Sequence, residues 1–82
     1  MKIRIIFADH RISDMIVEFP SAPSIGDSIE FPFECVKYTN GDTCYDSSFT
    51  VVSVSYKMKI SENGKSFEHD IIEIFIRTTQ LF

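Results

Sequence analysis

The sequence has no tryptophan and only two cysteines, three glycines and three prolines. Its longest apolar run, residues 5–8, is far shorter than the ~20 residues that a transmembrane helix needs. With so few glycines, neither a P-loop nor a G-x-G-x-x-G dinucleotide motif is present. The nucleophile elbow G-x-S-x-G is also missing. We therefore expect neither a membrane span nor a phosphate-binding loop, and we expect the protein not to be an enzyme.

The chain has 82 residues and a net charge of −4. This length allows one domain over residues 1–82 with a single modest core. The charge is uneven, because residues 27–46 hold five acids and the single base Lys37, whereas acids and bases balance elsewhere. An acidic chain is a poor nucleic-acid binder, because affinity for phosphate comes mainly from lysine and arginine. The polar stretch Asp9-His10-Arg11 interrupts the apolar start, so we expect no signal peptide and a cytoplasmic protein.

Alternation of apolar and polar residues predicts β-strands along most of the chain. The expected strands span residues 2–8, 13–19, 28–33, 49–60 and 66–78. Pro20 ends the second strand, and Gly26-Asp27 turns the chain into the third. Asn63-Gly64 predicts a hairpin between the last two strands. Leu81-Phe82 could pack back on the core, although we expect residues 79–82 to fray.

The alternation also predicts which side chains share a face. Ile29, Phe31 and Phe33 fall on one face of the third strand. In the fourth strand, Val52, Val54, Tyr56, Met58 and Ile60 form an apolar face, and Phe49 and Val51 lie opposite. Such a strand, buried on both sides at one end only, is typical of a barrel corner.

Residues 34–48 do not alternate cleanly. Residues 35–38 could pair with residues 43–45 around Asn40-Gly41, a dipeptide that favours a type I′ turn. An irregular loop is the alternative. A helix is disfavoured, because residues 39–43 are poor helix formers.

Five antiparallel strands in a meander with short turns predict an all-β fold, a small SH3-like barrel, with an OB-like or other small barrel as the alternative. The segments P-S-I-G-D-S-I-E-F (23–31), F-T-V-V-S-V-S-Y (49–56) and D-I-I-E-I-F-I (70–76) resemble those of small SH3-like β-barrel proteins of bacteriophages and mobile elements. The resemblance implies a fold and hardly any activity. The connection at 34–48 is longer than in that pattern.

Cysteines and histidines do not predict a metal site. Cys35 and Cys44 are separated by eight residues, whereas structural zinc sites use a tight C-x₂₋₄-C knuckle. His10 and His69 fall in different predicted turns. We expect two free thiols and no metal or other cofactor.

The candidate binding residues lie in the long connection. They are Tyr38, Asp42, Tyr45 and Asp46. Tyrosine gives contact area at low entropic cost, and acids steer basic partners. We therefore expect a small interaction or accessory protein that acts by contact with a protein partner. The alternative for the two rings is that they cover an open end of the barrel.

A second candidate is a weak nucleic-acid site on the basic hairpin at 57–65. Its residues would be Tyr56, Lys57, Lys59 and Lys65, with the tyrosine stacking on bases. Lysines at a hairpin are also a common protection of sheet edges against aggregation, and we favour that interpretation. Open strand edges could in addition pair two copies in a homodimer.

Overall fold

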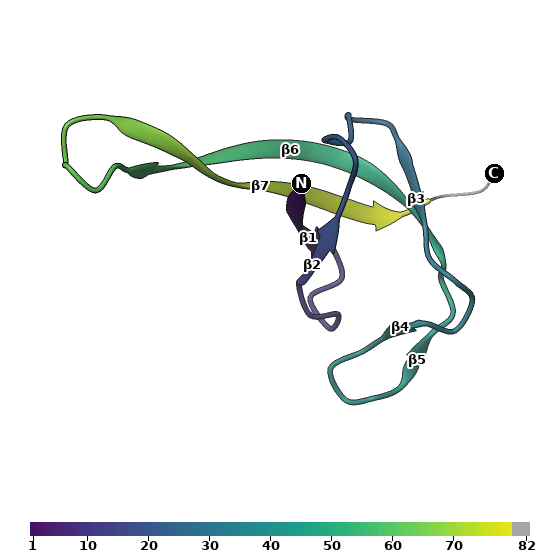
Figure 1. Cartoon of the computed structure of the whole chain (residues 1–82). Coiled ribbons are helices and arrows are strands. Elements are labelled where there is room, and N and C mark those ends of the chain that lie inside the picture. Colours follow the sequence, from purple (N-terminus) through teal and green to yellow (C-terminus); the bar gives the residue numbers. More distant parts are fainter. Residues whose placement is uncertain (80–82) are drawn as a thin grey trace.

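The computed structural model describes residues 1–79, in which every regular element is a β-strand (Figure 1). The strands are β1 (Lys2–Phe7), β2 (Met15–Glu18), β3 (Ser28–Glu30), β4 (Val36–Lys37), β5 (Thr43–Cys44), β6 (Ser48–Ile60) and β7 (Phe67–Thr78). The all-β prediction is confirmed, and the five main strands lie where the alternation predicts them. Leu81 and Phe82 lie outside the described residues. Residues 1–79 contain no helix that is long and apolar enough to cross a membrane.

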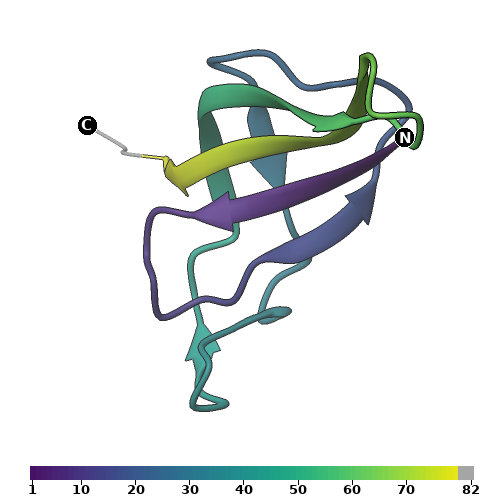
Figure 2. The ribbon, with the colours of Figure 1, turned by 90° about the vertical axis from the view of Figure 1, so that its left-hand side faces the viewer.

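Five strands form one sheet in the order β2-β1-β7-β6-β3, and the sheet curls into a half-barrel (Figure 2). The prediction that all strands are antiparallel is wrong, because β1 and β7 pair in parallel. Their register sets Ile3 beside Ile72 and Ile5 beside Ile74, so both isoleucine faces enter the same core. Local alternation of apolar and polar residues shows which side chains share a face of a strand, but not which strand pairs with it. It therefore could not predict a parallel neighbour so distant in the sequence.

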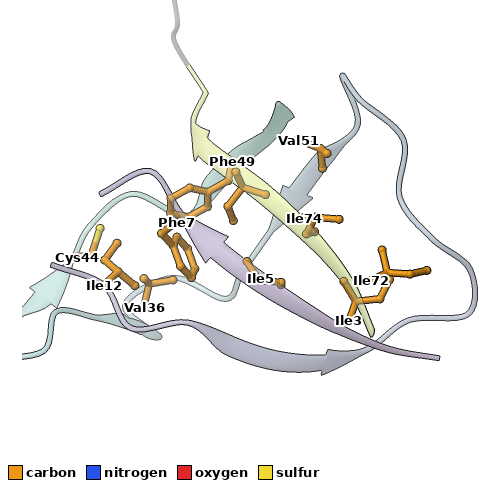
Figure 3. Packing of buried hydrophobic residues seen from close by; sticks show 11 residues of the cluster. Ile3, Ile5, Phe7, Ile12, Val36, Cys44, Phe49, Val51, Ile72 and Ile74 are labelled. Atoms are coloured by element: carbon orange, nitrogen blue, oxygen red, sulfur yellow. The ribbon is translucent and has the colours of Figure 1, made fainter. Parts of the chain in front are cut away.

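The concave side of the half-barrel holds the core (Figure 3). Three aromatic rings join its strands: Phe49 lies 5.2 Å from Phe7 and 5.8 Å from Phe31 in near-perpendicular geometry. Edge-to-face pairs of this kind contribute about 0.5–1.5 kcal/mol beyond their burial. The buried apolar residues are Ile3, Ile5, Phe7, Ile12, Val36, Cys44, Phe49, Val51, Ile72, Ile74 and Ile76.

The side chains of β6 are divided between its two faces differently from the prediction. Val51 pairs with Ile76, but the next partners are Ser53 and Phe75, so one extra residue of β6 bulges out at Val52. The bulge puts Phe49 and Val51 on the same face as Val54 and leaves Val52 exposed. A one-residue bulge exchanges the faces of every later residue, and an alternation pattern cannot locate it.

Residues 32–46 leave the sheet as an excursion closed at its base by the Phe31 N–H, which donates to the Ser47 carbonyl at 2.8 Å. Within it, β4 and β5 pair Val36 with Cys44 and Lys37 with Thr43, a shorter form of the hairpin expected as one of two alternatives. Gly41 has a φ of 93°, but Asn40 has no positive φ, so the turn is not the type I′ turn that this dipeptide favours. The excursion is anchored, because Val36 and Cys44 are buried beside Ile12 and Phe7 (Figure 3).

Candidate protein-contact site

The structure divides the four predicted binding residues into two pairs. At the tip of the β4–β5 hairpin, the Tyr38 N–H donates to the Asp42 carbonyl at 2.8 Å. Tyr45 and Asp46 follow β5 at the base of the excursion, where the chain returns to the sheet.

Tyr38 closes one end of the core. Its ring is half-buried against the core cluster, and the Arg11 guanidinium lies 4.6 Å from the ring centroid. The neighbouring Cys44 side chain, together with desolvation, raises the pKa of Tyr38 above its usual value. Backbone contact reinforces the position, since the Thr39 N–H donates to the Arg11 carbonyl at 2.7 Å. Tyr38 therefore packs as a structural residue that ties the excursion to the β1–β2 connection.

The Arg11 side chain is held in place by Asp9. The Asp9 carboxylate accepts hydrogen bonds from Arg11 Nε at 3.0 Å and Nη2 at 2.8 Å. These hydrogen bonds lower the pKa of Asp9 from 3.8, and the same pairing raises the pKa of Arg11. A fork of this kind orients the guanidinium plane over the tyrosine ring.

Asp42 takes part in the turn at the tip of the β4–β5 hairpin. Its N–H donates to Asn40 Oδ1 at 2.9 Å, and its carboxylate accepts from Asn40 Nδ2 at 3.1 Å. Such local bonds stabilise the turn at Asn40-Gly41. The carboxylate is nevertheless exposed and adds negative charge to the tip.

Tyr45 is 68% exposed and packs on a residue that the sequence interpretation missed. Its ring centroid lies 6.2 Å from that of Phe33, which is equally exposed. The prediction that Phe33 shares one face of the third strand with Ile29 and Phe31 is wrong, because the strand ends at Glu30 and the chain turns at residues 33–34. Pro32 was the available signal, since proline often ends a strand.

Acids flank this aromatic pair. Glu34 follows Phe33 with a φ of 64°, a left-handed conformation uncommon for a residue other than glycine. Asp46 follows Tyr45, and its Oδ2 accepts a hydrogen bond from the Thr78 hydroxyl at 3.4 Å. The nearest base in sequence, Lys37, donates to Thr43 Oγ1 at 2.7 Å on the β4–β5 hairpin. We call Phe33, Glu34, Tyr45 and Asp46 the contact patch.

The basic hairpin has a different geometry from that expected of a stacking site. Tyr56 lies on one face of the β6–β7 ribbon, and Lys57 and Lys59 point to the other face by strand alternation. Lys57 Nζ lies 3.6 Å from Glu73 Oε1, and Lys59 is paired in register with Glu68. Lys65 lies in the terminal turn. The structure thus separates the candidate stacking ring from two of the three lysines and sets those two beside acids.

No group of three or more potential metal ligands occurs among residues 1–79. Both cysteines are free; Cys35 is exposed and Cys44 is buried. Comparison of the chain with protein-family models, with curated proteins and with solved structures found no match.

Proposed function

We propose that the protein is a non-catalytic contact module that binds a protein partner through the contact patch. The observation that carries the proposal is the Phe33–Tyr45 pair, two aromatic rings that pack on each other while both remain two-thirds exposed. Large aromatic side chains are the residues most enriched at the centres of protein interfaces. While both rings remain exposed to water, they contribute little hydrophobic free energy to the fold.

The surroundings of the pair favour a basic partner. Glu34 and Asp46 flank the rings, and Asp42 adds charge at the hairpin tip. Acids around an apolar centre raise the association rate of a partner that carries lysine or arginine around an apolar residue. The anchored excursion supports this role, because a preorganised surface loses less conformational entropy on binding.

Substitution of two exposed tyrosines, Tyr45 in the contact patch and Tyr56 outside it, would test the proposal. The tagged protein would be used to capture partners from a lysate of the source organism, with and without nuclease. We expect one protein to be recovered regardless of nuclease, to be lost with Tyr45→Ser, and to be retained with Tyr56→Ser. Tyr56 is 62% exposed on the β6–β7 ribbon and controls for the loss of an exposed ring.

Two outcomes would contradict the proposal. Recovery that disappears with nuclease and with Tyr56→Ser, but survives Tyr45→Ser, would move the site to the lysine hairpin and to nucleic acid. Equal recovery with both variants would exclude the contact patch as the binding surface.

We further propose that the half-barrel is of the SH3-like kind and that the protein is a cytoplasmic accessory protein of a phage or mobile element. The sequence resemblance over residues 23–31, 49–56 and 70–76 supports this, together with a curled five-stranded sheet. An experimentally determined structure compared with known small barrels would test the architecture. Localisation of the tagged protein in the source cell would test the compartment.

A further inference from the structure

The distal half of the β6–β7 hairpin projects from the rest of the molecule (Figure 1). β3 pairs with β6 only at residues 48–50, and β1 pairs with β7 only at residues 72–76. Residues 56–70 therefore form a two-stranded ribbon without a third strand on either side, and we call this segment the arm. It contributes to a long axis of 48 Å in a molecule only 28 and 20 Å across.

One face of the arm is apolar and uncovered. Strand alternation and the cross-strand register place four large apolar side chains on it, together with His69. Their exposed fractions are 62% for Tyr56, 56% for Met58, 65% for Ile60 and 74% for Phe67. From the usual areas of such side chains, they present about 500 Å² of apolar surface, as large as the largest patch on a typical monomer.

A two-stranded ribbon of this kind is marginal in water, because it buries too little apolar surface to offset the entropy of ordering its residues. The arm is nevertheless long, with a register shift between Tyr56 and Met58 and pairs that extend to Ile60 and Phe67 next to its terminal turn. A second layer over the apolar face would supply the burial that is missing.

Addition of another strand at the edge of β6 is less favourable for two copies of this chain. An antiparallel two-fold pairing centred on Lys57 sets this lysine against itself, and one centred on Met58 sets Lys57 against Lys59. Lysines on exposed strands are a known means of discouraging such pairing. The apolar face of the arm is therefore a better surface for a second copy than the β6 edge.

We infer that the apolar face of the arm is a homodimer interface, in which two arms pack face to face around a two-fold axis. Charge supports a second copy as the occupant. The arm is neutral, with Lys57, Lys59 and Lys65 balancing Glu62, Glu68 and Asp70, although the chain as a whole carries −4. A neutral surface meets its own copy without the repulsion that the acidic segment 27–46 would cause.

The shape of the molecule agrees with this arrangement. In Figure 1 the terminal turn of the arm lies at the far left and the β4–β5 hairpin lies at the lower right, so the acidic excursion is away from the proposed interface. Two ribbons stacked at the usual ~10 Å would bring Met58 and Ile60 of each copy against Phe67 of the other. About 500 Å² of apolar surface per copy, with the polar rim added, approaches the ~800 Å² per partner of a standard interface.

The inference does not depend on the contact patch, which lies on the excursion. Its test is the oligomeric state of the full chain under reducing conditions, by sedimentation equilibrium from about 2 to about 500 μM, a range over which mass action reveals a moderate dimer. We expect the mass to rise from 9.4 kDa toward twice that value.

Two isoleucines of similar exposure give a matched pair of variants. Ile60→Glu places a charge in the proposed interface and should raise the dimer Kd at least ~100-fold. Ile25→Glu makes the same change at a side chain that is 68% exposed in the turn before β3, and should change Kd less than ~3-fold. Circular dichroism would establish that both variants are folded.

A second measurement needs no substitution. In an equal mixture of isotope-labelled and unlabelled protein, isotope-filtered NMR should show contacts between the Met58 methyl group of one copy and the Phe67 ring of the other. A chain that stays at 9.4 kDa at every concentration would overturn the inference. A dimer that Ile60→Glu leaves intact, or that both variants weaken equally, would overturn it as well.

Discussion

Val36→Ala tests whether the excursion is an integral part of the fold. The Val36 side chain is 2% exposed and lies beside Ile12 and Cys44, so the substitution removes two buried methyl groups (Figure 3). At about 0.8 kcal/mol for each buried methyl, the transfer free energy lost is ~1.6 kcal/mol. The cavity left behind raises the expected loss of unfolding free energy to about 2–3 kcal/mol.

The domain should tolerate this loss, because the usual unfolding free energy per residue gives a chain of this length about 4–12 kcal/mol. Urea unfolding of both proteins would measure the difference. Val52→Ala is the matched control, since this side chain is 37% exposed at the β6 bulge and its truncation should cost only about 0.5 kcal/mol.

Two spectroscopic probes sharpen the assay. The chain has no tryptophan, and two of its three tyrosines, Tyr38 and Tyr45, lie in the excursion. Tyrosine fluorescence therefore reports mainly on the excursion, whereas far-ultraviolet circular dichroism reports on the large sheet. We expect the two transitions to coincide. Equal stability of the two variants, or a fluorescence transition that precedes the dichroism transition, would refute an integral excursion.

Two further predictions concern charged groups near the sheet. The pKa of Asp9 should lie below 3.8 by NMR titration and return to its usual value in Arg11→Ala, whose guanidinium no longer donates to the carboxylate. Because the pKa of Asp9 is lower in the folded than in the unfolded protein, its contribution to stability is complete above pH 3.8 and is lost as the pH falls through the folded-state pKa. An NMR titration midpoint of Asp9 at or above 3.8 would contradict its pairing with Arg11. Arg4→Ala removes the donor that lies 2.9 Å from the largely buried Glu73 carboxylate and should lower the unfolding free energy by about 1–3 kcal/mol in urea titrations. Lys57→Ala should cost less, since its ammonium group is 3.6 Å from Glu73, and the reverse ranking would contradict the stated geometry.

Local alternation was sufficient to predict the strands but not their arrangement. The strand expected over residues 66–78 is present as β7, and its Ile72, Ile74 and Ile76 are buried. Alternation did not reveal the parallel partner β1 or the bulge at Val52, because pairing and register are set by contacts between distant segments. Ile12, which follows the polar stretch Asp9-His10-Arg11 and was assigned to no strand, is a core residue beside Val36 and Cys44 of the excursion.

The position of the candidate site could be predicted from the sequence, but the set of residues that form it could not. The unusual length of residues 34–48 located the excursion, and both tyrosines were identified from it. Which ring is buried depends on Arg11, a residue distant in sequence whose guanidinium lies over Tyr38 and not over Tyr45. Phe33 was placed on the same strand face as Ile29 and Phe31, because the sequence interpretation extended β3 past Glu30, where the strand ends.

The parallel pairing of β1 with β7 has a consequence for the biosynthesis of the protein. Residues 3–7 are synthesised well before their neighbours in the sheet, residues 72–76. Until then β1 has only β2 beside it, and the core lacks Ile72, Ile74 and Ile76. The sheet therefore cannot be completed until residues 72–76 have left the ribosome. Pairing between two segments so far apart in the sequence also slows folding, because a long intervening loop must close.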